Sequence, residues 1–267
     1  MSQTKYLSRV DDPLVINSGD DAVWADAADV VVVGLGGAGS VAALQARELG
    51  ADVIAIDRFD GGGATAASGG VIYAGGTRYQ REAGIEDSAA NMFDYLSQEE
   101  SAVREATLRQ FCEGSSDDID WLSAHGLQFG GKAYLEKTPY PPDEYYLYYS
   151  GNEKIPAYTR TAVPAARGHR THGTFATGYA YYASLRQAVE AAGVRLRLHS
   201  PVRRLVLNST ARETSLVSKS SQSQRITRPG IRRSMTRSFR CDHFRAGQTR
   251  ERSPRPESMS SASMSAS

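Results

Sequence analysis

Cysteine is scarce in this sequence, whose 267 residues include only Cys112 and Cys241. The two are far apart and form no Cys-x-x-Cys pair, so the sequence indicates neither a disulfide framework nor a thiolate metal site, and no metal is predicted. Long apolar runs are absent too, and none approaches the ~20 residues that span a bilayer. The N-terminus lacks the basic-then-apolar pattern of a secretory signal. These absences predict a cytoplasmic protein without a membrane partner.

Acidic side chains are few in the last part of the chain. Residues 209–267 hold eleven Arg and one Lys against four acidic residues, a net charge of +8, together with fifteen Ser and few large aliphatics. Taking these from totals of 31 basic and 30 acidic residues leaves 19 and 26 before position 209, a net charge of −7. A segment of this composition buries too little apolar surface to offset its ordering entropy. The sequence therefore predicts a disordered tail over 209–267.

A β-branched run that leads into glycines organises the rest of the chain. Residues 30–39 read Val-Val-Val-Val-Gly-Leu-Gly-Gly-Ala-Gly, and residues 40–50 have the pattern of an amphipathic helix closed by a glycine. Such a strand–turn–helix directs the unpaired N–H groups of the helix N-terminus toward a ligand phosphate. The stretch predicts a dinucleotide site, although a glycine-rich turn kept only for packing would look the same.

Each glycine of the motif has a separate expected role. Gly34 permits the tight turn, Gly36 lets the backbone approach a pyrophosphate, and Gly39 lets the helix pack against the strand. Residues 52–57 predict a second buried strand that ends in Asp57. The carboxylate of Asp57 can accept hydrogen bonds from ribose hydroxyls, which gives the glycine motif the context that it needs.

A second glycine-dense stretch follows at residues 60–70. Gly and Ala leave its backbone bare, so its N–H groups can reach a flat ligand or a diphosphate, while Thr65 and Ser68 offer hydroxyls. The stretch runs directly into 71–73, which has the composition of a strand. A loop that contacts the ligand is predicted, with a flexible surface loop as the alternative.

Residues 31–39, Asp57 and the run 62–77 together resemble the flavoproteins of the fumarate reductase and succinate dehydrogenase superfamily. Within it they are most similar to the 3-ketosteroid dehydrogenase branch. The resemblance implies FAD as the cofactor. Succinate dehydrogenases carry a loop histidine bonded to the flavin, and no His occurs between Asp57 and Thr77, so the implied FAD is non-covalent. The implied cofactor-binding residues are Gly34, Gly36, Gly37, Ala38, Gly39, Asp57, Arg58, Gly63, Ala64, Thr65, Ser68, Gly69, Gly70 and Val202.

The fold class that this resemblance implies is α/β, an incomplete Rossmann-type FAD-binding domain with the start of an inserted α+β substrate or cap domain. The expected parts are a lead-in at 1–28 packed loosely beside the first strand, the first part of the FAD-binding domain at 29–130, a partial cap at 131–177, a return to the FAD-binding domain at 178–208, and the tail at 209–267.

Helices and strands are predicted between and after the glycine loops. Helical segments are expected from a cap at Asp87 or Ser88, at 101–111, and at 116–122 with Gly126 closing the last. A hairpin is expected over 127–135, then a helix from 178 to 192 and strands at 194–198 and 202–207. The tyrosine-rich run 140–153 could supply a general acid, but buried phenols of a cap domain are the stronger interpretation, and catalytic residues are left unassigned.

The densest polar cluster is Arg167-Gly-His-Arg-Thr-His172. His169 and His172 are three residues apart, yet no third ligand lies nearby in the sequence, so a metal is not predicted. The arginines could bind an anionic substrate group or the flavin, or could lie in a solvated loop. Both alternatives stay open from the sequence.

The loss of apolar periodicity after Asn208 suggests a reading-frame shift near residues 208–212. On this hypothesis the strand at 202–207 loses its partner strand. The coding DNA tests the idea, which fails if neither alternative frame downstream encodes a glycine-rich flavoprotein continuation. The rival is a genuine Ser/Arg-rich arm that attracts nucleic acid by charge alone. Since the arm has no folded module or aromatic platform, no nucleic-acid partner is predicted.

For an intact member of this branch the resemblance implies removal of an acidic proton beside a carbonyl, with hydride passing to the flavin, on a 3-ketosteroid or similar enone. A fumarate-type reductase acting on a small dicarboxylate is the competing enzyme class. The chain itself is expected to turn over weakly or not at all. The alternatives to an enzyme are a non-catalytic flavin-binding remnant and a Ser/Arg-rich interaction protein. The oligomeric state and electron acceptor stay unassigned.

Overall fold

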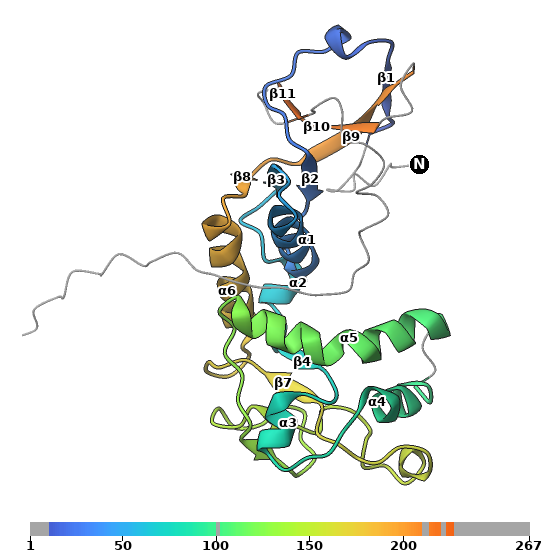
Figure 1. The fold of residues 1–267 in the computed structure, drawn as a ribbon. Helices are drawn as coiled ribbons and strands as arrows, with labels where there is room; N and C mark the ends of the chain where they lie inside the picture. Colours follow the sequence, from blue (N-terminus) through green and yellow to red (C-terminus); the bar gives the residue numbers. More distant parts are fainter. Residues whose placement is uncertain (1–10, 100–101, 210–213, 220–222, 227–267) are drawn as a thin grey trace, which may run out of the picture.

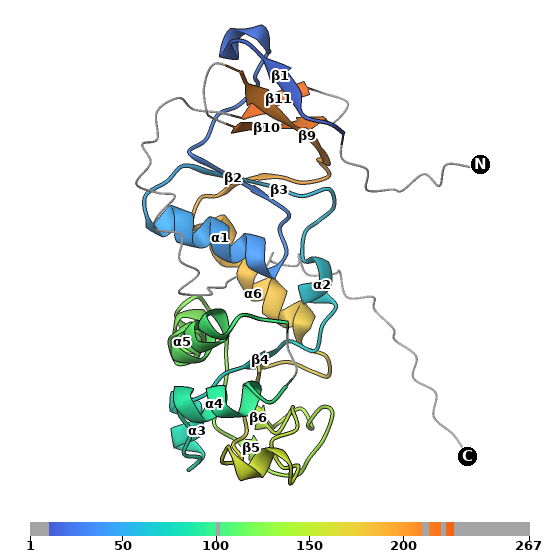
Figure 2. The same cartoon turned by 90° about the vertical axis from the view of Figure 1, so that its right-hand side faces the viewer.

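The computed structural model describes residues 11–99, 102–209, 214–219 and 223–226. Three sheets lie one above another along its long axis (Figures 1 and 2). The middle sheet is parallel, with the order β2-β3-β8. Helices α1 and α6 pack against each other beside it. These elements are β2 (Val30–Val33), α1 (Gly37–Glu48), β3 (Val53–Ile56), α6 (Gly178–Ala191) and β8 (Arg195–Arg197).

The middle sheet follows the predicted strand–helix–strand pattern. All four residues of β3 are buried, as expected for a central parallel strand covered on both faces. Helix α1 buries a stripe that includes Val41 and Leu44, and Gly50 follows it with φ +85°, the left-handed conformation that ends helices. The predicted helix after residue 178 and the strands around 194–198 and 202–207 are also present.

The lower sheet has the order β4-β7-β6-β5 and packs with three helices. Its first strand, β4, lies in the predicted first part of the FAD-binding domain, whereas the other three lie in the predicted cap. Sheet pairing therefore crosses the boundary expected at residue 130. The elements are β4 (Val71–Tyr73), α3 (Arg78–Glu82), α4 (Ala89–Leu96), α5 (Glu105–Ala124), β5 (Ala133–Tyr134), β6 (Leu147–Tyr148) and β7 (Gly168–Arg170).

The upper sheet corrects one expectation about the strand at 202–207. Its order is β1-β9-β10-β11, with β1 parallel to β9 and the other pairs antiparallel. The strand predicted to lose its partner is thus paired on both sides, and two stretches of the expected disordered tail are strands. Ser209 is also described, and its N–H donates to the Ile16 carbonyl at 2.8 Å, whereas the other tail positions lie outside the described residues. The elements are β1 (Leu14–Ile16), β9 (Val202–Asn208), β10 (Thr214–Lys219) and β11 (Ser223–Ile226).

The described part of the lead-in is anchored rather than loosely packed. Besides forming β1, it places Asp26 between two guanidiniums, 2.7 Å from Arg197 and in an ion pair with Arg195. Burial opposes ionisation of Asp26, but the Ala27 N–H and these two arginines outweigh it and hold the pKa of Asp26 below its usual value. The segment is therefore fastened to β8. It also contains a short 3-10 helix at Gly19–Asp21.

Two predicted local structures differ from those observed. The two helical segments expected at 101–111 and 116–122 are one helix, α5, because the Ser115 hydroxyl bonds back to the Cys112 carbonyl at 3.0 Å instead of capping a new helix. The hairpin expected over 127–135 is absent: β5 pairs with β6, in parallel. At Gly131 a Cβ would lie 2.8 Å from the Glu82 side chain, so this glycine allows close packing rather than a hairpin turn.

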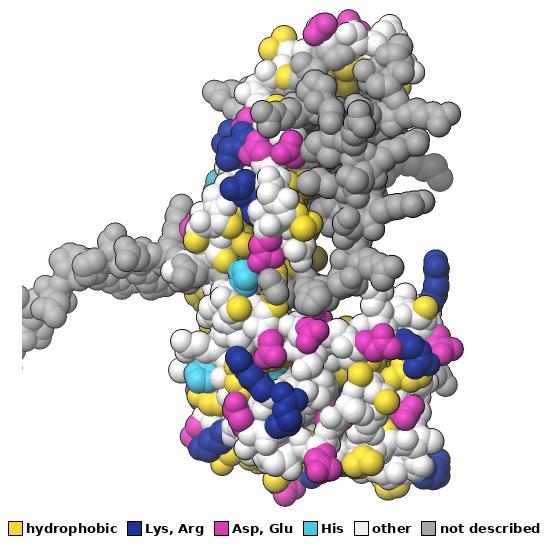
Figure 3. All heavy atoms as spheres, viewed as in Figure 1, with side chains coloured by type: hydrophobic (Ala, Val, Ile, Leu, Met, Phe, Trp, Pro, Cys, Tyr) yellow, Lys and Arg dark blue, Asp and Glu magenta, His cyan; other side chains and the backbone are white. Residues whose placement is uncertain are grey.

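Surface charge on the described residues is mixed. On the face in Figure 3, Lys and Arg side chains are interspersed with Asp and Glu rather than gathered into a basic stripe such as a nucleic-acid surface uses. In the described ranges, no helix combines the length and apolar character needed to cross a membrane.

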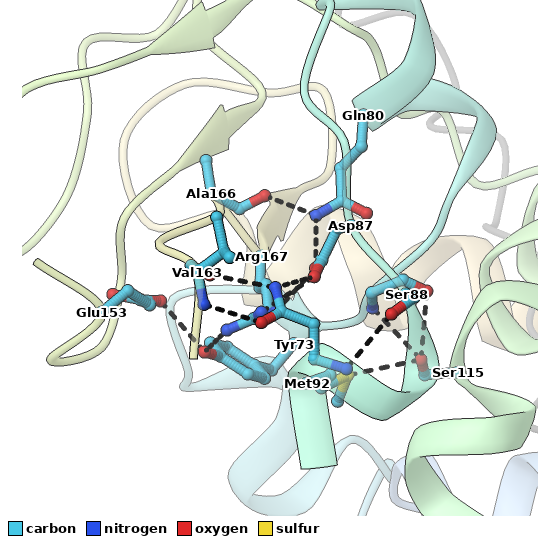
Figure 4. A network of polar contacts seen from close by, with 12 residues as sticks. Tyr73, Gln80, Asp87, Ser88, Met92, Ser115, Glu153, Val163, Ala166 and Arg167 are labelled. Carbon is cyan, nitrogen blue, oxygen red and sulfur yellow. Dashed lines mark hydrogen bonds and ion pairs between the residues drawn. The ribbon is translucent and has the colours of Figure 1, made fainter. Parts of the chain in front are cut away.

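A buried ion pair ties the lower sheet to its helices (Figure 4). Arg167 Nε lies 2.7 Å from Asp87 Oδ2 and Nη2 lies 2.8 Å from Oδ1, with both side chains fully buried. Gln80 Nε2 donates to the same carboxylate at 3.0 Å, and the Tyr73 hydroxyl reaches Glu153 at 3.1 Å. The two-point contact with Asp87 keeps the pKa of Arg167 raised despite its burial. The network fixes β4 and β7 relative to the segment before α4.

Replacing Asp87 by Ala is expected to lower the free energy of unfolding by about 3–5 kcal/mol, because the buried guanidinium of Arg167 loses its carboxylate. Urea unfolding measures the change. Glu105→Ala is the matched control, since it breaks an exposed ion pair with Arg109 and is expected to change stability by less than about 1 kcal/mol. Equal effects of the two substitutions would contradict the role of the buried pair.

Candidate cofactor site

The turn between β2 and α1 has the geometry that its glycines predict. Gly34 has φ +90°, and its N–H donates to the Ile56 carbonyl at 2.7 Å. A Cβ on Gly39 would lie 1.8 Å from the Gly34 carbonyl oxygen, so only glycine allows the helix to start this close to the strand. A Cβ on Gly36 would meet its nearest neighbour at 3.6 Å, an ordinary contact. Packing within the protein therefore explains Gly39 but does not require Gly36.

The second glycine loop lies directly against this turn. The Gly62 N–H donates to the Leu35 carbonyl at 2.8 Å, and a backbone bridge joins Gly36 to Gly62. The loop also contains a helical turn, α2 (Gly63–Ala66), where the sequence predicts only loop. Thr65 Oγ1 accepts the Gly37 N–H at 3.0 Å, so the two glycine stretches form one surface. The hydroxyl of Thr65 keeps its proton for a further acceptor.

This surface is open and built from small residues. Ala38, Gly63 and Ala64 are exposed at the N-terminal end of α1. The first N–H groups of a helix have no acceptor within the helix and carry a partial positive charge. Bare backbone, an α1 N-terminus and hydroxyls in one place fit the diphosphate of a dinucleotide.

Asp57 stands at the carboxyl end of β3, beside the glycine turn. Its Oδ2 accepts the Leu35 N–H and its Oδ1 accepts the Phe59 N–H, each at 2.7 Å. A carboxylate has about four acceptor positions, so two stay available for ribose hydroxyls. Arg58 is exposed, with its guanidinium 4.9 Å from the centre of the Phe59 ring. Val202 packs on Ile54 and Ile56 of the same strand, which brings this predicted contact to the side of Asp57.

The far end of the second loop is attached to α6 and the cap. Ser68 Oγ accepts the Gly70 N–H at 3.1 Å, and the Ser68 carbonyl accepts the N–H of Gly178, the first residue of α6, at the same distance. Gly70 has φ +68°, and a Cβ there would lie 2.5 Å from the Thr177 backbone. The predicted residues thus form two groups. Those around the N-terminus of α1 are open, whereas Ser68, Gly69 and Gly70 are held by contacts with Thr177 and Gly178.

The arginine cluster corrects both sequence interpretations. Arg170, like Arg167, is fully buried, and its guanidinium lies 2.7 Å from Asp143 Oδ1. The cluster is therefore neither a solvated loop nor a pair of cations open to a ligand. His169 is buried between Thr77 Oγ1 at 2.7 Å and the Arg167 carbonyl at 2.8 Å. These contacts hold β7 in place within the lower sheet.

The two histidines of the cluster have different surroundings. His172 is exposed at the surface and stacks on Tyr146 with ring centres 3.9 Å apart. The partial burial of its ring and the nearby charge of Arg170 lower the pKa of His172. In the part of the chain that the structure describes, no group of three or more His, Cys, Asp or Glu side chains has the arrangement of a metal site.

One polar anchor was missed by the sequence interpretation. The hydroxyl of Tyr140 lies 2.7 Å from the Gly69 carbonyl oxygen, across the gap between the cap and the second glycine loop. In the sequence Tyr140 is one of several tyrosines in a tyrosine-rich run, and neither spacing nor composition distinguishes it from its neighbours.

Comparison with known proteins gives consistent matches. Residues 29–259 match the family model described as "FAD binding domain". The chain is 41% identical over 204 residues to the 3-oxo-5-alpha-steroid 4-dehydrogenase of Comamonas testosteroni, a match that covers 75% of this chain and 38% of that protein.

Solved structures give the same picture. A 3-ketosteroid-delta4-(5alpha)-dehydrogenase from Rhodococcus jostii RHA1, in complex with 4-androstene-3,17-dione, superposes with a TM-score of 0.75 and 33% identity over 80% of this chain and 46% of that one. A flavocytochrome c3 fumarate reductase in its open conformation gives 0.61 and 27%, over 76% and 32%. The chain thus spans less than half the length of these relatives.

Gly36→Ala and Gly39→Ala separate packing from binding. Gly36→Ala is expected to leave the melting temperature of the apo chain unchanged but to weaken FAD binding by at least about tenfold, because its methyl group enters the space where a pyrophosphate would approach. Gly39→Ala is expected to reduce both the melting temperature and the FAD affinity, since its methyl group collides with the Gly34 carbonyl. Thermal melts and titration of flavin fluorescence measure the two effects. Unchanged FAD affinity in Gly36→Ala would show that the pyrophosphate lies elsewhere.

Stability is expected to fall in acid because of His169. Burial lowers the pKa of His169 to about 4, so the folded chain keeps the ring neutral while the unfolded chain takes up a proton near pH 6.5. This contribution is complete above pH 6.5 and is lost as the pH falls toward 4, a change of about 3 kcal/mol. Urea unfolding between pH 7 and pH 4.5 should show the slope. His169→Asn should flatten it, whereas His199→Gln, at an exposed histidine, should not.

Proposed function

Because the chain belongs to the FAD binding domain family, we propose that it carries the nucleotide-binding part of an oxidoreductase that acts on a 3-ketosteroid or a similar enone. FAD is the cofactor of this family, and when bound it exchanges hydride with a carbon near a carbonyl group. The role of the described residues is to bind and orient the cofactor.

The glycine turn and Asp57 hold the pyrophosphate and the adjoining ribose in this proposal. Gly36, Gly37 and Ala38 present backbone at the N-terminus of α1, and Thr65 has a hydroxyl proton to donate beside them. Asp57 would accept hydrogen bonds from the ribose hydroxyls, and Val202 would contact the adenine. The remaining assigned residues are Gly34, Gly39, Arg58, Gly63, Ala64, Ser68, Gly69 and Gly70. The attachment is non-covalent because the loop contains no histidine.

The observation that carries the substrate assignment is the burial of Arg167 and Arg170. A reductase of small dicarboxylates needs cations that are free to meet two carboxylates. In this chain both arginines of the cluster are fully buried against Asp87 and Asp143, and burial keeps His169 neutral near pH 7. A ligand with carbonyl groups and an apolar ring system requires no such cations. The identity to a steroid dehydrogenase over 204 residues supports the same assignment.

A second candidate is a flavin-binding chain that does not turn over. It is favoured by one observation, that the match covers 38% of the steroid dehydrogenase and leaves the rest of that protein without a counterpart among the matched residues. In this case the chain binds FAD without turnover.

Anaerobic mixing of the FAD-loaded chain with substrates distinguishes the candidates. On the steroid assignment, a saturated 3-ketosteroid is expected to bleach the oxidised flavin absorbance slowly, since this chain is expected to turn over weakly, and fumarate is expected to leave the chemically reduced flavin unoxidised. Reoxidation by fumarate, with no response to the steroid, would overturn the steroid assignment. Bound flavin that responds to neither would support the non-catalytic candidate. Release of intact FAD on denaturation checks the non-covalent attachment.

A further inference from the structure

The Tyr140 phenol oxygen is one of the groups that join the cap to the second glycine loop; the Thr177 N–H and hydroxyl also donate to the Gly69 carbonyl, at 3.2 and 3.1 Å. The Tyr140 oxygen lies 2.7 Å from the Gly69 carbonyl and 2.6 Å from the Phe175 carbonyl, and it accepts the Arg170 Nε–H at 2.9 Å and the Thr177 N–H at 3.1 Å. A phenol donates one proton and accepts at two positions. The hydrogen-bonding capacity of Tyr140 is therefore fully used, and two carbonyls share its proton.

The cap side of this junction is held firmly. The Arg170 guanidinium is fully buried and donates to Asp143 Oδ1 and to the Gly173 carbonyl, both at 2.7 Å. A guanidinium with these contacts has its plane fixed by several donors at once. The position of the Tyr140 oxygen is thus set by β7 and by the segment that precedes β6.

The segment just before α6 contains a strained residue. Phe175 has φ +53°, a left-handed backbone that an aromatic residue adopts only when its surroundings impose it. Its carbonyl meets Tyr140 and Arg170, and its N–H donates to Asp143 at 2.7 Å. The Phe175 ring itself is 78% exposed. These contacts therefore fix the backbone before α6 rather than bury an aromatic ring.

We propose that Tyr140 is a positioning residue for FAD. Together with Thr177, its hydroxyl holds Gly69 and the start of α6 in a single arrangement, so that the part of the second glycine loop beyond the pyrophosphate is ordered before the cofactor arrives. The proposal rests on the FAD site proposed above and not on the identity of the substrate. Preorganisation of this kind raises affinity because less backbone has to be ordered on binding.

Tyr140→Phe in the full 267-residue chain tests the proposal, with Tyr145→Phe as the matched control. Tyr145 lies in the same segment, but its ring packs on Tyr134. Tyr140→Phe is expected to raise the FAD dissociation constant about tenfold and to increase amide hydrogen exchange in the apo chain at 68–70 and 174–178, with little change at 37–48. It should also alter the fine structure of the bound flavin absorbance. The control should change none of these.

Two results would overturn the proposal. One is that Tyr140→Phe matches the control in FAD affinity and in exchange at 68–70. The other is that exchange rises over the whole chain and the melting temperature falls while the FAD affinity and spectrum stay unchanged, which would make the hydroxyl a general stabilising group. If the unmodified chain binds no FAD, the proposed cofactor site fails, and exchange at 68–70 in the two variants still decides whether Tyr140 orders the loop.

Discussion

The close approach of two glycine-rich backbones is the constraint on which the rest of the structure depends. Gly39 lets helix α1 begin against the Gly34 carbonyl because it has no side chain, and Gly61 lies against the Leu35 carbonyl for a related reason, since a Cβ there would be 2.9 Å from that oxygen. Together these contacts bring the N-terminus of α1 and the second loop onto one open surface. A methyl group at Gly39 would separate the helix from the strand, and the open surface formed by the two glycine stretches would change its shape.

Ion pairs of two buried arginines provide rigidity around the open surface at the N-terminus of α1. The exposed surface at Ala38, Gly63 and Ala64 has few side chains with which to resist motion. Around it, the pair of Arg167 with Asp87 fixes the lower sheet, and the pair of Arg170 with Asp143 fixes the junction at Tyr140. Burying these charges is costly unless both partners are present. The arginines that looked available for a ligand are therefore part of the framework that supports the ligand site.

The three sheets have different roles: the middle sheet carries candidate binding residues, and the lower and upper sheets support neighbouring segments. The middle sheet presents Asp57 and the glycine turn at the carboxyl ends of its strands, where ligands bind in open parallel sheets. The lower sheet holds the second loop from beyond Gly70, and the upper sheet pairs the lead-in with β9. Val202, the first residue of β9, packs against the cluster of Ala28, Ile54 and Ile56, next to the strand that ends at Asp57.

The sequence by itself determined the elements whose signals are local. The β-branched run before Gly34, the helix closed by Gly50, the Ser88 cap of α4 and the helix that ends before Gly193 were predicted from periodicity and capping alone. The resemblance to flavoproteins added FAD, which the family match confirms. Only the tertiary structure decided contacts between distant segments, because spacing along the chain does not encode which strand or carboxylate will be a neighbour. In the tertiary structure β9 pairs with β1 and β10, the two expected helices are the single helix α5, and both arginines of the cluster are buried. The tertiary structure also singled out Tyr140 among many tyrosines, since the role of that hydroxyl depends on a carbonyl 71 residues away.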